Sequence, residues 1–271
     1  MFKSLISNIL RKSHLLHLSD KLSYLIRKFR NLSVNKEFRR QNPTIKLPPD
    51  YLIYESFQLD YKKYYSDSHE TAIWLKELLS KHISLFNVNI LDWGCGPARI
   101  TRHLPTVIGN ACFYYGTDYN PRTIQWCRDH IKGINFAQNH LGPPLEFNDQ
   151  FFHIIYGISI FTHLSEPMHK AWMKELSRIL SRGGIMLQTT QGSAFRIKLT
   201  KKELELFDAE KLVVRGQVRE GHRIYSAFQP EAYMRKLFAN LEVLEFIPGE
   251  ISGGRPQQDV WIVKKPNPDA R

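Results

Sequence analysis

The stretch NILDWGCGPARI (residues 89–100) decides the fold of this chain. It reads as a short apolar strand that runs into a glycine turn, and a helix is expected to follow over 97–104. Gly94 and Gly96 have no Cβ atom, so a ligand can approach the backbone closely there. Dinucleotide-binding folds share such a turn, so the neighbouring residues must decide which ligand it suits.

Short apolar runs alternate with helical patterns from Asn87 onward. We expect strands at 88–93, 112–118, 134–138, 151–157 and 184–189, and helices at 97–104, 121–131 and 165–180. This alternation is typical of a parallel sheet with helices on both faces. The sequence therefore predicts a doubly wound α/β fold.

The carboxyl-terminal part departs from the simple alternation. Residues 190–229 are expected to form an insertion, with a helix after the capping box Thr200-x-x-Glu203 and a hairpin over 213–228 that could act as a lid. A helix near 230–239 and strand-like runs at 241–247 and 258–265 then complete the domain. We assign 67–265 to this domain and 266–271 to a short tail.

The amino-terminal segment differs in charge from the rest. Residues 1–40 contain ten Lys and Arg against two acidic residues, so they carry a net charge of about +8 of the chain's +12. An apolar seam recurs there every three or four residues, at Leu15, Leu18, Leu22, Leu25, Phe29 and Leu32. We expect a basic amphipathic helical arm over 1–41, and a linker with a tyrosine-rich aromatic segment over 42–66.

Composition limits the class of protein. At 271 residues, with 42% hydrophobic residues, the chain suits one α/β domain of ordinary size plus an extension. Its three cysteines follow no disulfide or zinc-binding pattern, which indicates a reduced compartment. No apolar run is long enough to cross a bilayer. We therefore expect a cytoplasmic protein, attached at most to the surface of a membrane.

Two acidic residues indicate which ligand the glycine turn suits. A dinucleotide fingerprint needs glycine or alanine three residues after Gly96, where this chain has Arg99. Asp92 directly before the turn would repel a pyrophosphate, but it suits a ligand with an ammonium and a sulfonium group. Asp118, at the end of the next strand, is placed to accept hydrogen bonds from two ribose hydroxyls.

The chain resembles class I S-adenosylmethionine (SAM)-dependent methyltransferases, with a particular similarity to bacterial members associated with glycan and secondary-metabolite modification. The segments that carry the resemblance are LDWGCGPAR, GTDYNP, PPLEFNDQFFHIIYGISIFTHLSE and LSRILSRGGIMLQTTQG. The resemblance covers about residues 60–265. It implies a seven-stranded sheet whose last two strands are antiparallel, SAM as the cofactor, and cofactor contacts by Asp92, Gly94, Cys95, Gly96, Asp118 and Tyr119.

The chain departs from the family pattern after the third strand. The acid that often contacts the adenine amino group there is replaced by Asn139-His140. We expect Asn139, His140 or a backbone group near Leu141 to contact adenine instead. Tyr156, at the end of the fourth strand, is also assigned to the cofactor site.

The acceptor is expected beyond the carboxyl end of the fourth strand. His163 is the best single candidate for a base there, because an imidazole titrates near neutral pH, and a positioning or pocket-lining role is its alternative. Ser159, Tyr65, Glu220 and His222 are further candidates for the acceptor pocket. No Asn/Asp-Pro-Pro-aromatic motif, cysteine or metal-ligand cluster occurs at this place, which disfavours exocyclic-amine, pyrimidine-carbon and metal-assisted methylation.

The sequence predicts methyl transfer from SAM, with a hydroxyl of a sugar, glycan or other small polar metabolite as the first choice of acceptor. An RNA or protein methyltransferase that uses the basic arm is the alternative enzyme, although the mildly basic body makes a nucleic-acid partner the less favoured one. A non-catalytic SAM-binding scaffold is the third. For the arm we consider packing on its own domain, a homodimer or a peripheral membrane contact.

Overall fold

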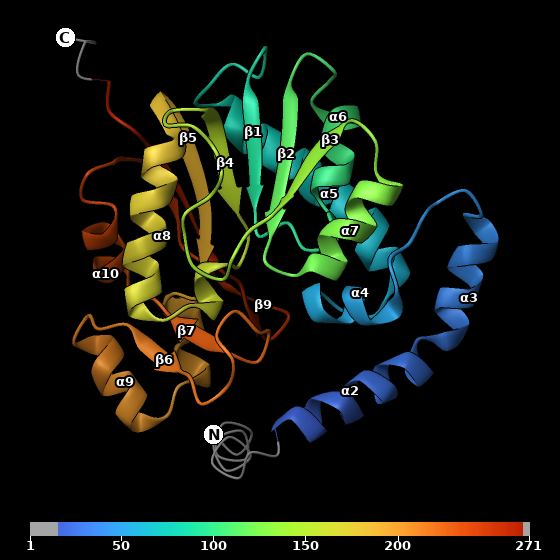
Figure 1. Cartoon of the computed structure of the whole chain (residues 1–271). Coiled ribbons are helices and arrows are strands. Elements are labelled where there is room, and N and C mark those ends of the chain that lie inside the picture. The colour runs from blue at the N-terminus through green and yellow to red at the C-terminus, as the bar shows by residue number, and fades with distance from the viewer. Residues whose placement is uncertain (1–15, 268–271) are drawn as a thin grey trace.

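The computed structural model describes residues 16–267, in which a central sheet lies between helices (Figure 1). The sheet has seven strands in the order β3-β2-β1-β4-β5-β11-β8. Their bounds are β1 Asn89–Trp93, β2 Phe113–Asp118, β3 Ile134–Gln138, β4 Phe152–Gly157, β5 Leu180–Thr190, β8 Glu242–Ile247 and β11 Asp259–Lys264. These bounds agree with the expected strands to within one residue, except that β5 begins at Leu180 and not at 184.

Most of the sheet is parallel. β1 pairs in parallel with β2 and with β4, so the chain leaves β1 toward one edge and returns to the other side of it. β11 is antiparallel to both β5 and β8. The predicted doubly wound sheet with an antiparallel carboxyl-terminal pair is therefore confirmed. A crevice is expected where the chain changes direction, at the carboxyl ends of β1, β2 and β4.

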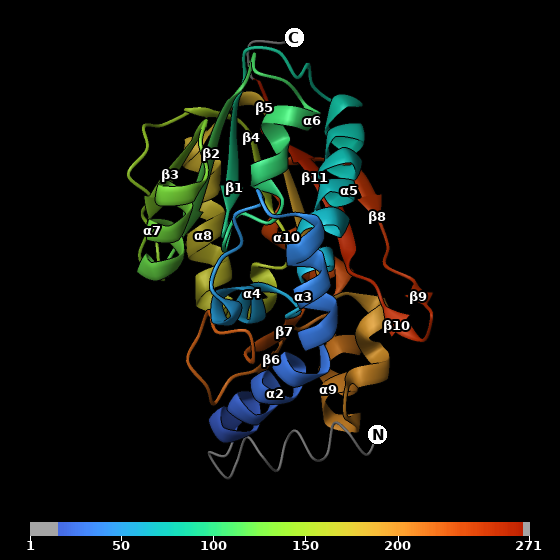
Figure 2. The ribbon, with the colours of Figure 1, turned by 90° about the vertical axis from the view of Figure 1, so that its right-hand side faces the viewer.

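Helices cover both faces of the sheet (Figure 2). α5 and α6 pack on one face, and α8 and α10 pack on the other, each through a buried apolar cluster. In the cluster beneath α8 and α10, the ring centroids of Trp93 and Trp172 lie 5.1 Å apart. α7 covers β2 and β3 at the edge. The bounds are α5 Tyr61–Ser80, α6 Leu104–Val107, α7 Pro121–His130, α8 Glu166–Ile179 and α10 Glu231–Leu237.

Local capping residues explain several helix starts. Asn120 Oδ1 accepts a hydrogen bond from the Arg122 N–H, and Pro121 begins α7. Thr200 and Glu203 form the predicted capping box of α9 (Lys201–Asp208). The helix expected over 97–104 is wrong for most of that range: residues 97–100 form turns, η1 (Thr101–His103) is a 3-10 helix, and α6 begins only at Leu104.

The insertion between β5 and α10 contains a small second sheet. β6 (Val213–Arg215) and β7 (Ser226–Phe228) pair in antiparallel register, which confirms the predicted hairpin. The 3-10 helix η3 (Ser193–Lys198) and α9 precede this hairpin. A further hairpin of β9 (Ile251–Ser252) and β10 (Arg255–Pro256), which we did not predict, lies before β11.

The amino-terminal segment is more ordered than predicted. The arm forms two helices, α2 (Leu16–Arg30) and α3 (Leu32–Gln41), and the expected linker contains α4 (Asp50–Ser56). α5 begins at Tyr61, inside the expected linker and aromatic segment, because the Asp60 side chain caps it by accepting the Lys63 N–H. The aromatic residues of this segment, Tyr54 among them, pack into a core of their own, so 42–66 is not simply a linker.

The apolar seam of the arm is not covered by the rest of the described chain. Leu18, Leu22, Leu25, Phe29 and Leu32 are all exposed, so the prediction that the seam packs on its own domain is wrong for these residues. Leu15, most of the tail and the first part of the arm lie outside the described residues. Within residues 16–267 no helix is long and apolar enough to cross a membrane.

Candidate active site

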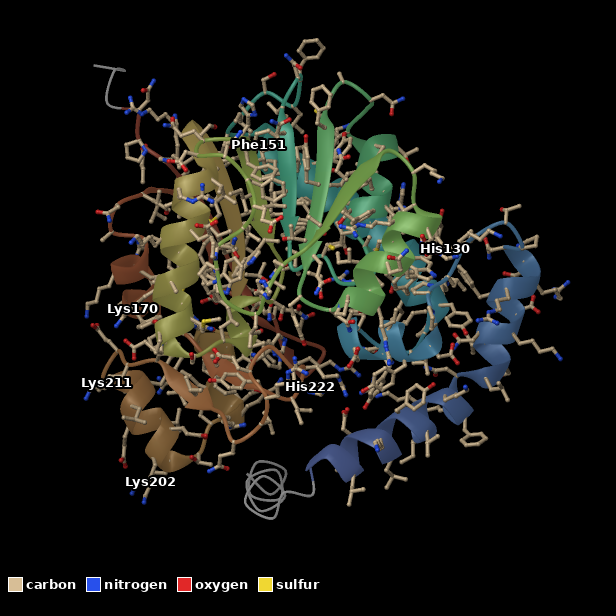
Figure 3. All side chains as sticks on the ribbon, viewed as in Figure 1. His130, Phe151, Lys170, Lys202, Lys211 and His222 are labelled. Carbon is tan, nitrogen blue, oxygen red and sulfur yellow. The ribbon has the colours of Figure 1, made fainter. Side chains whose placement is uncertain are left out.

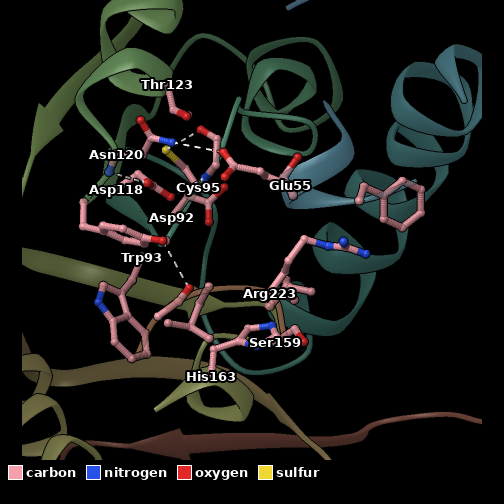
Figure 4. Close-up of a pocket in the computed structure, with 18 of the residues that line it drawn as sticks. Glu55, Asp92, Trp93, Cys95, Asp118, Asn120, Thr123, Ser159, His163 and Arg223 are labelled. Carbon is pink, nitrogen blue, oxygen red and sulfur yellow. Dashed lines mark hydrogen bonds between the residues drawn. The ribbon is translucent and has the colours of Figure 1, made fainter. Parts of the chain in front are cut away.

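A cavity of about 610 Å³ lies at the carboxyl ends of the central strands. This volume is typical of sites that hold a cofactor or a drug-sized ligand. Its wall combines the glycine turn, the end of β2, α4, and the loop that joins β6 to β7. Figure 4 shows Asp92, Asp118 and Cys95 gathered on one side, with Ser159, His163 and Arg223 across the cavity from them.

The glycine turn is held by β2. The N–H groups of Gly94 and Cys95 both donate to the Thr117 carbonyl, at 2.8 Å each. Gly94 has φ +76°, and a Cβ there would overlap the side chain of Ile160. Ala98, which replaces the usual third glycine, has φ +56°. The turn therefore keeps its left-handed backbone despite that replacement.

Asp118 is fixed at the rim of the turn. Its Oδ2 accepts the Gly96 N–H at 3.0 Å, and its Oδ1 accepts the Asn120 N–H at 2.8 Å. Burial raises the pKa of this carboxyl to about 6, although the two N–H groups oppose the rise. Each oxygen keeps a lone pair for a ligand, so Asp118 can accept two hydroxyl hydrogens, as predicted for a ribose.

Asp92 lies deeper in the same wall. It accepts a hydrogen bond from the Thr101 hydroxyl, and the Tyr156 hydroxyl donates to that same Thr101 oxygen at 3.3 Å. Burial raises the pKa of Asp92 to about 6. A cation in the cavity would stabilise both carboxylates and offset the free energy lost by their desolvation.

The segment after β3 carries a polar group without a partner. Asn139 Nδ2 donates to the His140 carbonyl, but the buried Asn139 Oδ1 has no hydrogen-bond partner within residues 16–267. The Trp172 indole N–H donates to the Leu141 carbonyl at 3.1 Å and holds this segment against α8. Asn139 and Leu141 both line the cavity, so an amide oxygen and an apolar side chain are available to an adenine.

Several lining residues were missed from the sequence. Glu55, on α4, lies 3.3 Å from Asn120 Nδ2, and burial raises the pKa of its carboxyl. The half-buried Arg99 guanidinium lies 4.7 Å over the ring of Phe57, and Arg99 lines the cavity. Glu55 and Phe57 reach the site only because α4 folds back over the glycine turn, and no local pattern indicates that contact.

The opposite wall contains most of the predicted acceptor residues. His163 Nδ1 lies 2.8 Å from the Tyr225 carbonyl. Ser159 has the left-handed φ of +67°, and its Oγ accepts a hydrogen bond from Gln258 Nε2 at 2.8 Å. His222 also lines the cavity. These groups make this wall polar.

Four predicted site residues do not line the cavity. Tyr65 packs on the ring of His103, with 4.7 Å between ring centroids, because it lies on a different side of α5 from the cavity. Tyr156 is fully buried behind Asp92 and acts through Thr101. His140 is exposed at the surface, and Glu220 accepts the Ser165 N–H at the start of α8. Another tyrosine of α5, Tyr64, instead donates to the Pro97 carbonyl at 2.6 Å and supports the glycine turn.

Comparison with known proteins agrees with this geometry. Residues 90–184 match the family model described as methyltransferase domain. The match begins in β1 and includes the glycine turn, Asp118 and His163. Residues 90–184 therefore carry a methyltransferase domain, within a fold of the class I SAM-dependent type. The prediction of family, enzyme class and cofactor is therefore confirmed.

Solved structures share the fold at low sequence identity. A SAM-dependent methyltransferase from Methanosarcina mazei is 19% identical with a TM-score of 0.55, over 70% of this chain and 97% of that one. A putative sarcosine dimethylglycine methyltransferase from Galdieria sulphuraria is 14% identical with a TM-score of 0.54, over 73% and 86%. Magnesium protoporphyrin IX methyltransferase from Synechocystis PCC 6803, with bound SAH, is 13% identical with a TM-score of 0.53, over 89% and 98%.

None of these three proteins is named for a sugar or glycan acceptor. The similarity to glycan-associated members therefore stays a prediction.

The residues of this methyltransferase fit SAM. Asp118 would hold the ribose hydroxyls, and the free Asn139 Oδ1 can accept a hydrogen bond from the adenine amino group. Asp92 and Glu55 supply negative charge for the ammonium and sulfonium groups, while the half-buried Arg99 suits the carboxylate of the amino-acid part. The bare backbone of Gly94 and Gly96 leaves room between them.

Proposed function

We propose that this methyltransferase methylates a hydroxyl of a sugar, a glycan or another small polar metabolite, with His163 as the general base. The orientation of the His163 imidazole is the observation that carries the proposal. A carbonyl oxygen can only accept, so the 2.8 Å contact with Tyr225 requires the proton to be on Nδ1. Nε2 then keeps its lone pair.

The protonation state of His163 supports the same role. Burial lowers the pKa of the imidazole, and the nearby Arg223 and His222 lower it further. His163 is therefore neutral at pH 7 and able to take a proton. A hydroxyl acceptor needs such a base, because an alcohol is a weak nucleophile while it keeps its hydrogen.

The reaction is a single displacement. SAM supplies an electrophilic methyl carbon, and its sulfur leaves as a neutral thioether. His163 Nε2 takes the hydroxyl proton while the acceptor oxygen forms its bond to that carbon and the carbon–sulfur pair of electrons moves to sulfur. The remaining residues have to align the acceptor and exclude water.

The polar wall favours an acceptor with several hydrogen-bonding groups. Ser159, His222, Gln257 and Gln258 line this side of the cavity. The loop between β6 and β7 covers it, because the Gly221 N–H donates to the His163 carbonyl at 2.9 Å and the Tyr119 hydroxyl donates to the Gly221 carbonyl at 3.3 Å. This loop supports the proposed lid and ties it to His163 itself.

Labelling identifies the acceptor. The protein is incubated with SAM that carries an isotopically labelled methyl group and with a metabolite extract, and the labelled products are separated and fragmented in a mass spectrometer. We expect the label on an oxygen of a polar small molecule or glycan. Label on nitrogen or carbon, or only on RNA or protein, would overturn the proposal.

The role of His163 is then tested with the acceptor found in this way. In His163→Asn the side-chain amide can replace Nδ1–H as the donor to Tyr225, but no base remains. We expect kcat to fall about 10²- to 10⁴-fold, with SAM affinity unchanged and the acidic limb of the pH–rate profile lost. His153→Asn, at a histidine outside the cavity lining, serves as the control. A kcat near wild type in His163→Asn would assign His163 to positioning instead.

A further inference from the structure

An exposed apolar surface runs along the outer side of α2 and reaches the first residue of α3. Leu18, Leu22, Leu25, Phe29 and Leu32 recur every three or four residues and are between 47% and 75% exposed. We call these five residues the outer stripe. A contiguous exposed stripe of large apolar side chains is rare on a monomeric protein and marks an interaction surface.

The opposite side of α2 is fixed to the catalytic domain. The ring of Tyr24 lies edge-on to Tyr54, with 5.3 Å between centroids. Asp20 pairs with Arg223 and also accepts the Tyr54 hydroxyl, and Lys28 Nζ lies 3.2 Å from the Asp50 carboxylate. These contacts hold the outer stripe away from the domain. They also join α2 to the cavity, because Arg223 lines it.

Basic residues border the outer stripe. Lys21 precedes Leu22 directly, Arg30 follows Phe29 directly, and both side chains are exposed. The sequence before α2 continues this composition, since residues 1–15 contain Lys, Arg, Leu and Ile but no acidic residue. Lysines beside an apolar stripe can extend their charged ends toward anionic headgroups while their methylene stems stay on apolar surface.

A second patch lies at the same end of the molecule. Ile197 and Leu206 are 56% and 45% exposed, and Lys201 and Lys202 are exposed near them in the sequence. We call these four residues the α9 patch. Figures 1 and 2 both place α9 and α2 at the end of the molecule next to the carboxyl edge of the sheet. Figure 3 shows Lys202 pointing outward from this end. One flat partner could therefore contact both helices.

We propose that the outer stripe and the α9 patch rest on the surface of an anionic lipid bilayer. Such a surface offers apolar depth for leucine and phenylalanine and negative charge for lysine and arginine. A second copy of this chain fits less well, because two arms in contact would each carry the same net charge of about +8. A nucleic acid would match the charge but leave the outer stripe in water.

Vesicle flotation of the full-length protein tests the proposal. Vesicles of phosphatidylcholine with about 30% phosphatidylserine are compared with neutral phosphatidylcholine vesicles. We expect binding to the anionic vesicles and much weaker binding to the neutral ones, by about fivefold for each basic residue that reaches the surface. In Leu22→Ser/Phe29→Ser the partition coefficient should fall about a hundredfold, roughly tenfold for each side chain.

The control variant removes apolar side chains of similar exposure at the opposite edge. Phe86 and Phe113 are 72% and 54% exposed, near the amino ends of β1 and β2. Phe86→Ser/Phe113→Ser should therefore bind vesicles as wild type does. Analytical ultracentrifugation of wild type and both variants gives their oligomeric states. It therefore tests the other possible occupant of the outer stripe, a second copy of this chain. A wild-type dimer that Leu22→Ser/Phe29→Ser converts to monomer without any vesicle binding would overturn the proposal, as would equal loss in the control or equal binding to neutral vesicles.

Discussion

Replacing Asp118 with asparagine should weaken SAM binding while leaving the fold intact. The carboxylate accepts the Gly96 N–H at 3.0 Å and the Asn120 N–H at 2.8 Å, and each oxygen offers its other lone pair to the cavity. Asparagine has the same shape but only one acceptor oxygen. Its amide NH₂ would face one of these two N–H donors and could not accept from a ribose hydroxyl on that side.

The size of the effect follows from the bond that is lost. A hydrogen bond to a charged group contributes about 1.5–3 kcal/mol, and the attraction between the carboxylate and a cationic ligand is lost as well. We therefore expect a loss of about 2–3 kcal/mol in binding free energy, or a rise in Kd of roughly 30- to 150-fold. Isothermal titration calorimetry with SAM at pH 7.5 measures this directly.

The matched control is Asp259→Asn. Asp259 is also buried, burial also raises its pKa to about 6, and it also accepts a backbone N–H, from Gly249 at 2.8 Å, but it does not line the cavity. Its variant should bind SAM as wild type does. A Kd for Asp118→Asn within about threefold of wild type, at an unchanged melting temperature, would refute the assignment of Asp118 to the cofactor.

Two further predictions concern the same wall of the cavity. The pKa values of Asp92 and Asp118 are about 6 in the protein without ligand, and a cationic ligand favours the ionised forms. SAM affinity should therefore fall as pH is lowered through 6. The fall should reach up to about tenfold per pH unit for each carboxyl that must release a proton. Calorimetry that shows constant SAM affinity from pH 7 to pH 5 would contradict this prediction. Gly94→Ala should lower stability by more than the roughly 1–2 kcal/mol that a left-handed backbone costs an alanine, because its Cβ would overlap Ile160. Gly254→Ala, with a similar φ of +71° and open space around it, should show only the backbone cost in thermal melts, and equal losses in the two variants would show that the overlap is relieved.

Local signals predicted the central sheet well because its strands are short apolar runs bounded by turn and cap residues. The pairing of β1 with both β2 and β4, and its register, come from the tertiary structure. The same local signals placed Asp118 and the glycine turn, since both lie at strand ends. The packing of the aromatic segment could not be predicted from such local signals. Tyr54, Tyr61 and Tyr64 are buried by α2 and α3 and by the turn after β1, which are distant in sequence.

The positions of the strands along the chain, the glycine turn, Asp118 and the charge of the arm could all be inferred from the chain itself, because each depends on neighbours within a few residues. The composition of the cavity wall depended on packing. Glu55, Arg223 and Gln258 come from segments far apart along the chain and meet only after α4 and the β6–β7 loop fold over the sheet edge. Tyr64 and Tyr65 differ by one position on α5, yet a rotation of about 100° per residue directs one to the glycine turn and the other to His103.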